Sequence, residues 1–295
     1  ASKGTTQSRV TLVLEAGTYN ISNSIKIPPH ATIKGAGRNK TFIIQTGNYP
    51  IFTTVNSNST PGNYADDSTS TSLTQAQDIT LEGMTLQHNL GSFTGIELVS
   101  CKNSVFKNLQ IKGPWTSGTG IVAASIGVSM DNLSTVVGCF NNLFDDVKID
   151  GFAHGVKSDD DVYENTFTNC LFDLLSYGVW FGENTIVGAQ GQSTGPQRNL
   201  FESSTFSNID RNAIIFQTGR YNVSSNNKFL NVGNNGGTST AAAYTIINSV
   251  QEGNKTCGDW FSRTNDLMLD TAFQTTPYIS EVQGPIHSGY SFSNK

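Results

Sequence analysis

The middle of the chain repeats a short pattern of polar and apolar residues. A polar residue, usually Asn or Asp, is followed three positions later by an apolar anchor, and apolar residues recur three and five positions after that anchor. The polar residues are Asp78, Asn103, Asn141, Glu164, Arg198 and Asn226, and the anchors are Leu81, Phe106, Phe144, Phe167, Phe201 and Phe229. Spacings of a few tens of residues, without a helical period, indicate a solenoid of short strands.

A second apolar segment follows each of the first five anchors. It begins with Gly or Ala and continues with alternating apolar residues, at 95–98, 120–123, 155–158, 178–181 and 213–216. Each unit therefore holds two short strands joined by turn residues. We predict an all-β fold, a right-handed, single-stranded parallel β-helix, whose coils stack about 4.8 Å apart and carry asparagine ladders in their turns. The longest gaps between anchors predict loops near residues 113–138 and 184–197.

Composition supports this fold class and excludes several partners. The chain has 29 Gly and 29 Asn among 295 residues, so turn formers are abundant. Its net charge of −5 offers no basic surface for a phosphate backbone, which argues against a nucleic-acid partner. No apolar run approaches the roughly 20 residues of a membrane helix, so we expect no membrane insertion.

The cysteines and histidines predict neither a metal site nor a cofactor. No Cys-x-x-Cys pair occurs, and His30, His88, His154 and His287 lack ligand spacing. Cys101 and Cys139 each stand five residues before an anchor, so they occupy one place in the repeating unit and are predicted to stack. Buried free thiols are favoured over a disulfide, because free cysteine behaves as a small hydrophobe. Such thiols are compatible with assembly in a reducing cytoplasm.

Residues 10–37 carry the most specific pattern. A strand is followed by Ala16-Gly17-Thr18-Tyr19, a second strand, Pro28, a third strand and Gly35-Ala36-Gly37. This arrangement resembles the opening coil of the pectate-lyase-like right-handed parallel β-helix superfamily. That superfamily includes pectate lyases, polygalacturonases, epimerases and bacteriophage tailspikes, so the resemblance implies the fold more than a function.

The enzyme branches of that superfamily are tested by their motifs. None of the six arginines lies in the Arg-x-Pro-x-x-Arg segment of pectate lyases. Of the four polygalacturonase motifs only Asp-Asp is present, within residues 159–161. What remains is most similar to bacteriophage tailspike and tail-associated proteins. That resemblance implies a tail structural protein for host-surface attachment, without catalysis.

The same resemblance implies the partners and the place of the protein. We expect a homotrimer that contacts other phage tail proteins and a host surface polysaccharide. The protein would be assembled in the host cytoplasm and act in the virion tail. The abrupt start at Ala1 predicts a fragment of a longer protein. We expect the β-helix over residues 1–250, where the repeat stops, and a cap or oligomerisation segment over 251–295.

The second strands of each unit supply the candidate site. Their alternation places Val156, Val179 and Ile214 inward. Lys157, Trp180 and Ile215 then face outward as an exposed patch that contacts either a glycan or another subunit. Continuing this alignment brings Asp160 and Glu183 onto adjacent coils. Two carboxyl groups about 5 Å apart suit a retaining glycosidase.

Other functions remain open at this point. The first alternative is a tailspike depolymerase, an endo-acting glycoside hydrolase that uses Asp160 and Glu183 as acid and nucleophile. The second is a secreted bacterial polysaccharide lyase or epimerase. Against catalysis, residues 159–161 also suit a solvated turn. Asp145, Asp146 and Asp150 are expected to be solvated.

Overall fold

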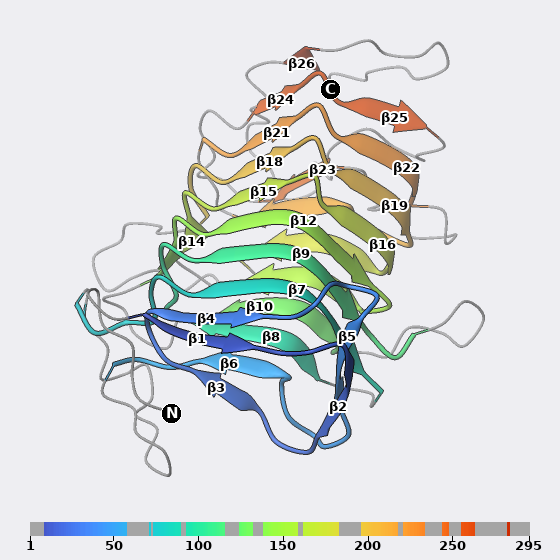
Figure 1. The fold of residues 1–295 in the computed structure, drawn as a ribbon. Helices are drawn as coiled ribbons and strands as arrows, with labels where there is room; N and C mark the ends of the chain where they lie inside the picture. Colours follow the sequence, from blue (N-terminus) through green and yellow to red (C-terminus); the bar gives the residue numbers. More distant parts are fainter. Residues whose placement is uncertain are drawn as a thin grey trace.

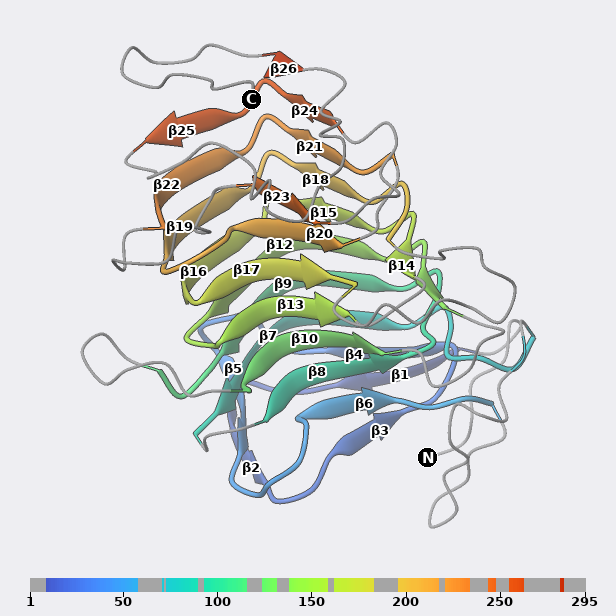
Figure 2. The ribbon, with the colours of Figure 1, turned by 180° about the vertical axis from the view of Figure 1, so that it is seen from behind.

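The fold is a stack of parallel coils with three faces, as a computed structural model shows (Figures 1 and 2). The structure describes residues 9–57, 71, 73–89, 93–115, 124–131, 138–158, 162–182, 196–217, 221–233, 244–247, 255–262 and 282–283. Every strand pair in this part of the chain is parallel, and none of these residues is helical. Each coil runs along the first, second and third face in turn and then rises to the next coil.

The strands of the three faces follow the order of the coils. The first face holds β1 (Val10–Val13), β4 (Ala31–Lys34), β7 (Thr80–His88), β9 (Val105–Lys112), β12 (Leu143–Asp150), β15 (Thr166–Thr168), β18 (Leu200–Glu202), β21 (Val223–Ser225), β24 (Lys255–Cys257) and β26 (Val282–Gln283). The second holds β2 (Gly17–Ile21), β5 (Thr41–Gln45), the later halves of β7, β9 and β12, β16 (Leu171–Leu175), β19 (Thr205–Ile209), β22 (Lys228–Val232) and β25 (Trp260–Ser262). The third holds β3 (Ile25–Ile27), β6 (Phe52–Thr54), β8 (Thr94–Val99), β10 (Ile126–Asp131), β13 (His154–Ser158), β17 (Tyr177–Phe181), β20 (Ile214–Gln217) and β23 (Tyr244–Ile247). A short pair, β11 (Cys139–Phe140) and β14 (Val162–Tyr163), lies where the third face returns to the first.

The fold is thus the predicted right-handed parallel β-helix. The chain climbs from β1 to β26 as it turns. In each view the strands of the first face and those of the third face run in opposite directions (Figures 1 and 2). A right-handed crossover is the path that twisted parallel strands favour. Within the described residues, the interior strands of the two long sheets have partners on both sides, so their edges are covered.

Apolar side chains of equivalent positions form ladders inside the helix. The rings of Phe106, Phe144, Phe167 and Phe201 stack coil upon coil, with centroids 4.4 to 4.8 Å apart. All four side chains are completely buried. Burying one such ring contributes about 1.5–3 kcal/mol, and stacked pairs add about 0.5–1.5 kcal/mol. Four of the predicted anchors therefore form one continuous ladder in the core.

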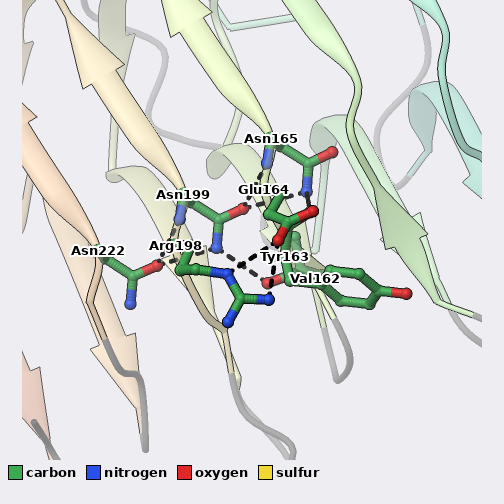
Figure 3. A network of polar contacts seen from close by, with 7 residues as sticks. All are labelled: Val162, Tyr163, Glu164, Asn165, Arg198, Asn199 and Asn222. Atoms are coloured by element: carbon green, nitrogen blue, oxygen red, sulfur yellow. Dashed lines mark hydrogen bonds and ion pairs between the residues drawn. The ribbon is translucent and has the colours of Figure 1, made fainter.

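The corner before the first face carries an amide ladder, which we call the amide corner: Asn142, Asn165, Asn199 and Asn222. Figure 3 shows the last three of these asparagines. In each step the side-chain oxygen of one asparagine accepts the backbone N–H and the side-chain N–H of the asparagine one coil earlier, at 3.0 to 3.1 Å. The remaining side-chain N–H donates to a carbonyl, as from Asn199 to Val162 O at 2.9 Å. The predicted asparagine ladder is confirmed at this corner.

The predicted cysteine stack lies beside the amide corner. Cys101 and Cys139 are buried and free, and the backbone N–H of Cys101 lies 3.3 Å from Cys139 Sγ. Cys170 is also free and buried, whereas Cys257 is exposed. The expectation of buried thiols in one repeat position is confirmed for Cys101 and Cys139.

Two assignments of the repeat were wrong by part of a coil. Phe229 pairs with Phe206 on the second face, whereas Phe201 is followed in its own ladder by Ser224. The second-strand position of the fourth coil belongs to Gly127, because Val128 pairs with both Ile96 and Val156; the segment 120–123 lies outside the described residues. β10 therefore falls inside the range predicted as a loop. In both cases a second, similar pattern lay nearby, and pattern matching had no register constraint to choose between them.

The stack also continues beyond the predicted end of the repeat. β24 pairs with β21, and β25 pairs with β22, both in parallel. Residues 255–262 therefore add a further coil after residue 250. The role of 251–295 as a cap or oligomerisation segment stays a prediction, and most of that segment lies outside the described residues.

Candidate functional site

An aromatic column lies on the outer surface where the second face turns into the third. His154 and Tyr177 begin the adjacent strands β13 and β17, and their rings stack with centroids 5.0 Å apart and planes 11° from parallel. Trp180 lies edge-on to Tyr177 at 4.8 Å. Arg211, from the next coil, places its guanidinium 5.4 Å from the centre of the Tyr177 ring and donates from Nη1 to the Tyr177 hydroxyl. We call His154, Tyr177, Trp180 and Arg211 the aromatic corner.

Glycines let neighbouring coils approach closely at this corner. In β17 both Gly178 and Val179 are buried, so Tyr177 and Trp180, three residues apart, remain on the outer side. A Cβ on Gly178 would lie 2.3 Å from Ala213 O, and one on Gly155 would lie 2.5 Å from Gly178 O. Only a residue without a side chain allows this approach between coils. The local sequence Tyr-Gly-Val-Trp thus positions the two large rings.

Arg211 differs from other arginines of the stack in what its guanidinium contacts. Arg38 binds both carboxylate oxygens of Asp146, at 2.8 and 2.9 Å, and Arg198 binds Glu164 at 2.8 Å. Within the described part of the chain, Arg211 forms no ion pair, and it is exposed. Its guanidinium contacts Tyr177, and its backbone N–H donates to Ser176 O. The corner therefore presents a fixed positive group at its surface.

Trp180 contributes carbon surface to this corner. The residue is half-buried, and its indole Nε1 is buried without a hydrogen-bond partner among the described residues. The N–H group is therefore not what the ring presents outward. An amphipathic ring with exposed carbon edges suits contact with the apolar face of a sugar.

The predicted outward row of Lys157, Trp180 and Ile215 is present, although not all three side chains reach solvent. Lys157 pairs with Trp180, and Trp180 pairs with Ile215, while Val156, Val179 and Ile214 are fully buried inside. Lys157 and Trp180 are half-buried, whereas only 3% of Ile215 is exposed. The expectation that Ile215 forms an exposed patch is wrong, since outward direction on a strand does not guarantee contact with solvent. Asp160 and Glu183 lie outside the described residues.

A different carboxyl pair lies on the second face, and the sequence analysis missed it. Asp150 and Asp173 are direct partners across β12 and β16, one strand spacing apart, about 4.8 Å between backbones. Asp150 accepts from Gln110 at 2.9 Å and lies 3.5 Å from Lys148 Nζ. Asp173 accepts from the Ser207 hydroxyl at 2.6 Å.

This geometry corrects the expectation that Asp150 is solvated, because only 7% of the residue is exposed. Asp145 and Asp146, by contrast, are partly exposed. The signal for the pair was available in the repeat: each aspartate directly follows the apolar residue five positions after an anchor. His154 was likewise noted only as lacking metal-ligand spacing, although it and Tyr177 both immediately precede a ladder glycine.

Neither a metal-binding group nor a membrane span is seen in the described part of the chain. Within those residues no three or more His, Cys, Asp or Glu side chains gather to hold a metal ion. No helix there has the length and hydropathy needed to cross a bilayer.

Comparison with known proteins gives the fold. No family model and no curated protein matches the sequence. Among solved structures, ORF18 of Geobacillus virus E2 superposes with a TM-score of 0.60 at 13% identity, over 93% of this chain and 54% of that one. The gp42 tailspike of Acinetobacter phage vb_AbaP_AS12 gives 0.59 at 12% identity, over 87% and 41%. Pectate lyase Bsp165PelA from Bacillus sp. N165 gives 0.51 at 13% identity, over 94% and 81%.

The resemblance seen in the opening coil is thereby confirmed at the level of fold. This chain is a parallel β-helix similar in architecture to a viral protein, a phage tailspike and a pectate lyase. It spans about half the length of the two phage proteins that it matches. At these identities the likeness shows the shared architecture alone, and a function has to be argued from the surface.

Proposed function

We propose that this chain is the β-helix portion of a bacteriophage tail protein that attaches to a polysaccharide on the host surface. The observation that carries the proposal is the aromatic corner. Trp180 and Tyr177 are held at the outer surface of a rigid stack, beside an exposed arginine. Sugar rings bind to such surfaces through their apolar faces, with polar groups at the rim.

The architecture supports this role in two ways. The likeness to two phage proteins covers most of the chain. A stack with few free strand edges also unfolds slowly and offers proteases few openings, which suits a particle exposed outside the cell. A homotrimer, contact with other tail proteins and a place in the virion tail complete the proposal.

A panel of bacterial surface polysaccharides tests attachment. Purified protein is titrated with capsular polysaccharides, O-antigens and neutral dextran, and binding is measured by calorimetry. We expect at least one surface polysaccharide to bind, with the Trp180→Ala variant weakening it about tenfold, the loss of one well-packed sugar contact. Tyr49→Ala is the matched control, since Tyr49 is 50% exposed and lies between β5 and β6, three strands away from β13 in the sheet of the third face. Absence of binding across the panel, or equal loss in both variants, contradicts the proposal.

A second candidate function, glycoside hydrolysis, rests on the pair Asp150 and Asp173. Their direct pairing places the two aspartates one strand spacing apart between backbones. That is the order of separation of the two carboxyl groups in a retaining mechanism, in which one protonates the leaving oxygen and the other attacks the sugar. The hydrogen bonds from Gln110 and Ser207 hold the two side chains in place.

Chain-length analysis of the bound polysaccharide decides between attachment and hydrolysis. Incubation that yields shortened oligosaccharides indicates catalysis. Asp150→Asn and Asp173→Asn then each abolish the shortening, while circular dichroism shows an unchanged fold. Asp145→Asn serves as control, because Asp145 contacts the exposed Asn169 instead. An intact polymer after prolonged incubation leaves attachment as the function.

A further inference from the structure

We infer that the aromatic corner selects a glycan whose pyranose units carry carboxylate groups, with Arg211 as the residue that binds the carboxylate. The inference rests on the proposed function and names its ligand class. It follows from three features of the corner: an oriented guanidinium, carbon surface beside it, and the contrast with arginines that are already paired.

The guanidinium is held in a defined orientation by Tyr177. His154 stacks on this ring from the preceding coil, and Arg211 covers it from the following coil. One nitrogen, Nη1, also donates to the Tyr177 hydroxyl. Tyr177 is therefore a positioning residue, and a stacked guanidinium keeps its remaining N–H groups in a planar fork.

That fork matches a carboxylate in shape and charge. Parallel N–H donors of arginine bind the two oxygens of a carboxylate, and such charge-assisted bonds are stronger than neutral ones. Arg38 shows a guanidinium of this chain binding a carboxylate, since its Nη2 donates to both oxygens of Asp146. At Arg211 no described residue supplies the carboxylate, so the position is open to one from a ligand.

The position of Trp180 favours a ligand that carries a ring next to its carboxylate. It contacts Tyr177 edge-on and lies 5.6 Å from His154, so it adjoins the same column. Its exposed part is carbon surface, since Nε1 is buried. A pyranose ring offers an apolar face to this surface while its carboxylate reaches Arg211. A linear polyol phosphate carries the charge without the ring, so it serves as a contrast.

Calorimetry with matched probes tests the inference. The probes are oligosaccharides of hyaluronan, oligosialic acid, the same hyaluronan oligosaccharides after carboxyl reduction, and a glycerol-phosphate polymer. We expect one of the two carboxylated probes to bind wild-type protein. For that probe, carboxyl removal and the Arg211→Gln variant are each expected to weaken binding about tenfold, the size of one charge-assisted contact. Where oligosialic acid is the probe that binds, its carboxyl-reduced form is titrated too.

Two further variants separate the charge from the ring. Trp180→Ala is expected to weaken both carboxylated and carboxyl-reduced probes. Arg198→Gln is the matched control, because this arginine is exposed and paired with Glu164, and its loss is expected to leave binding unchanged.

The inference is overturned if neither carboxylated probe binds, if the reduced form binds equally well, or if Arg211→Gln binds like wild type. Equal binding of the glycerol-phosphate polymer overturns the requirement for a ring. These outcomes differ from failure of the proposed function. A protein that binds neutral surface polysaccharides through Trp180 keeps the attachment role and loses only the preference for acidic sugars.

Discussion

The amide corner and the aromatic corner are two bends of the same coils, but their side chains make different kinds of contact. At the amide corner the asparagines are buried and bond to one another and to carbonyls (Figure 3). At the aromatic corner the rings are half-buried, and an exposed arginine has no carboxylate partner in the described part of the chain. A corner whose polar groups all bond to the chain itself stabilises the fold. A corner that exposes carbon surface and a charge can bind a ligand.

The largest expected effect comes from breaking the amide corner. Asn199→Ala leaves the backbone N–H of Asn165 without its partner. It also removes one hydrogen bond from the Asn165 side-chain amide and one from the Val162 carbonyl, which keeps the bond from Gln197. The unsatisfied N–H costs about 1–3 kcal/mol and each of the two other lost hydrogen bonds about 0.5–1.5 kcal/mol, so we expect a loss of about 2–5 kcal/mol in the free energy of unfolding. Urea denaturation measures it. Asn39→Ala, at an exposed turn, is the control, and equal stability of the two variants would show that the ladder is dispensable.

A smaller loss is expected from closing the backbone approach at the aromatic corner. In Gly155→Ala the new methyl would meet Gly178 O at 2.5 Å and Leu175 Cδ1 at 2.8 Å. Overpacking of this kind costs about 1–3 kcal/mol. The control is Ala213→Gly, which occupies the same ladder and is expected to cost about 0.5–1 kcal/mol from backbone entropy. Thermal unfolding compares them, and a stabilised Gly155→Ala variant would refute the packing argument.

The buried thiols predict a dependence on pH. Burial raises the pKa of Cys101 and of Cys170 from 9.0 to about 12. Because the unfolded thiols ionise first, this contribution is complete below pH 9 and is lost as the pH rises from 9 towards 12. At pH 10 the ionisation of each thiol in the unfolded state has lowered the free energy of unfolding by about 1 kcal/mol.

Urea denaturation across this range is the measurement for the thiols. Cys101→Ala is expected to flatten the decline, and Cys257→Ser, at an exposed position, is expected to leave it unchanged. Identical curves for all three proteins would contradict the role of burial.

The smallest change in stability is expected at the aromatic corner itself. Tyr177→Phe keeps the stacking with His154 and removes the hydroxyl that accepts from Arg211. We expect a change below about 1 kcal/mol in unfolding free energy, with binding of a carboxylated glycan weakened about threefold. Tyr221→Phe is the control at an exposed turn. Loss of binding to the carboxyl-reduced glycan as well would show that Tyr177 contacts the sugar directly.

The sequence contained most of the fold because equivalent positions of a stacked coil face the same surroundings. Phe144, Phe167 and Phe201 recur as anchors, and Asn142, Asn165 and Asn199 each precede an anchor by two residues. Inward and outward directions on β13, β17 and β20 followed from the alternation of a strand. These are local rules, and they hold wherever the coil is regular.

The pairing of distant residues required the folded molecule. Register decided that Gly127 rather than Gly120 joins the glycine ladder, and that Phe229 pairs with Phe206. Burial of Ile215 and Asp150 depends on neighbours that no strand pattern specifies. Arg211 meets Tyr177 across 34 residues, because insertions of unequal length between coils leave no constant spacing to read. Repetition therefore encodes the coil, while contacts between coils, formed only on stacking, create the surface that we propose binds a ligand.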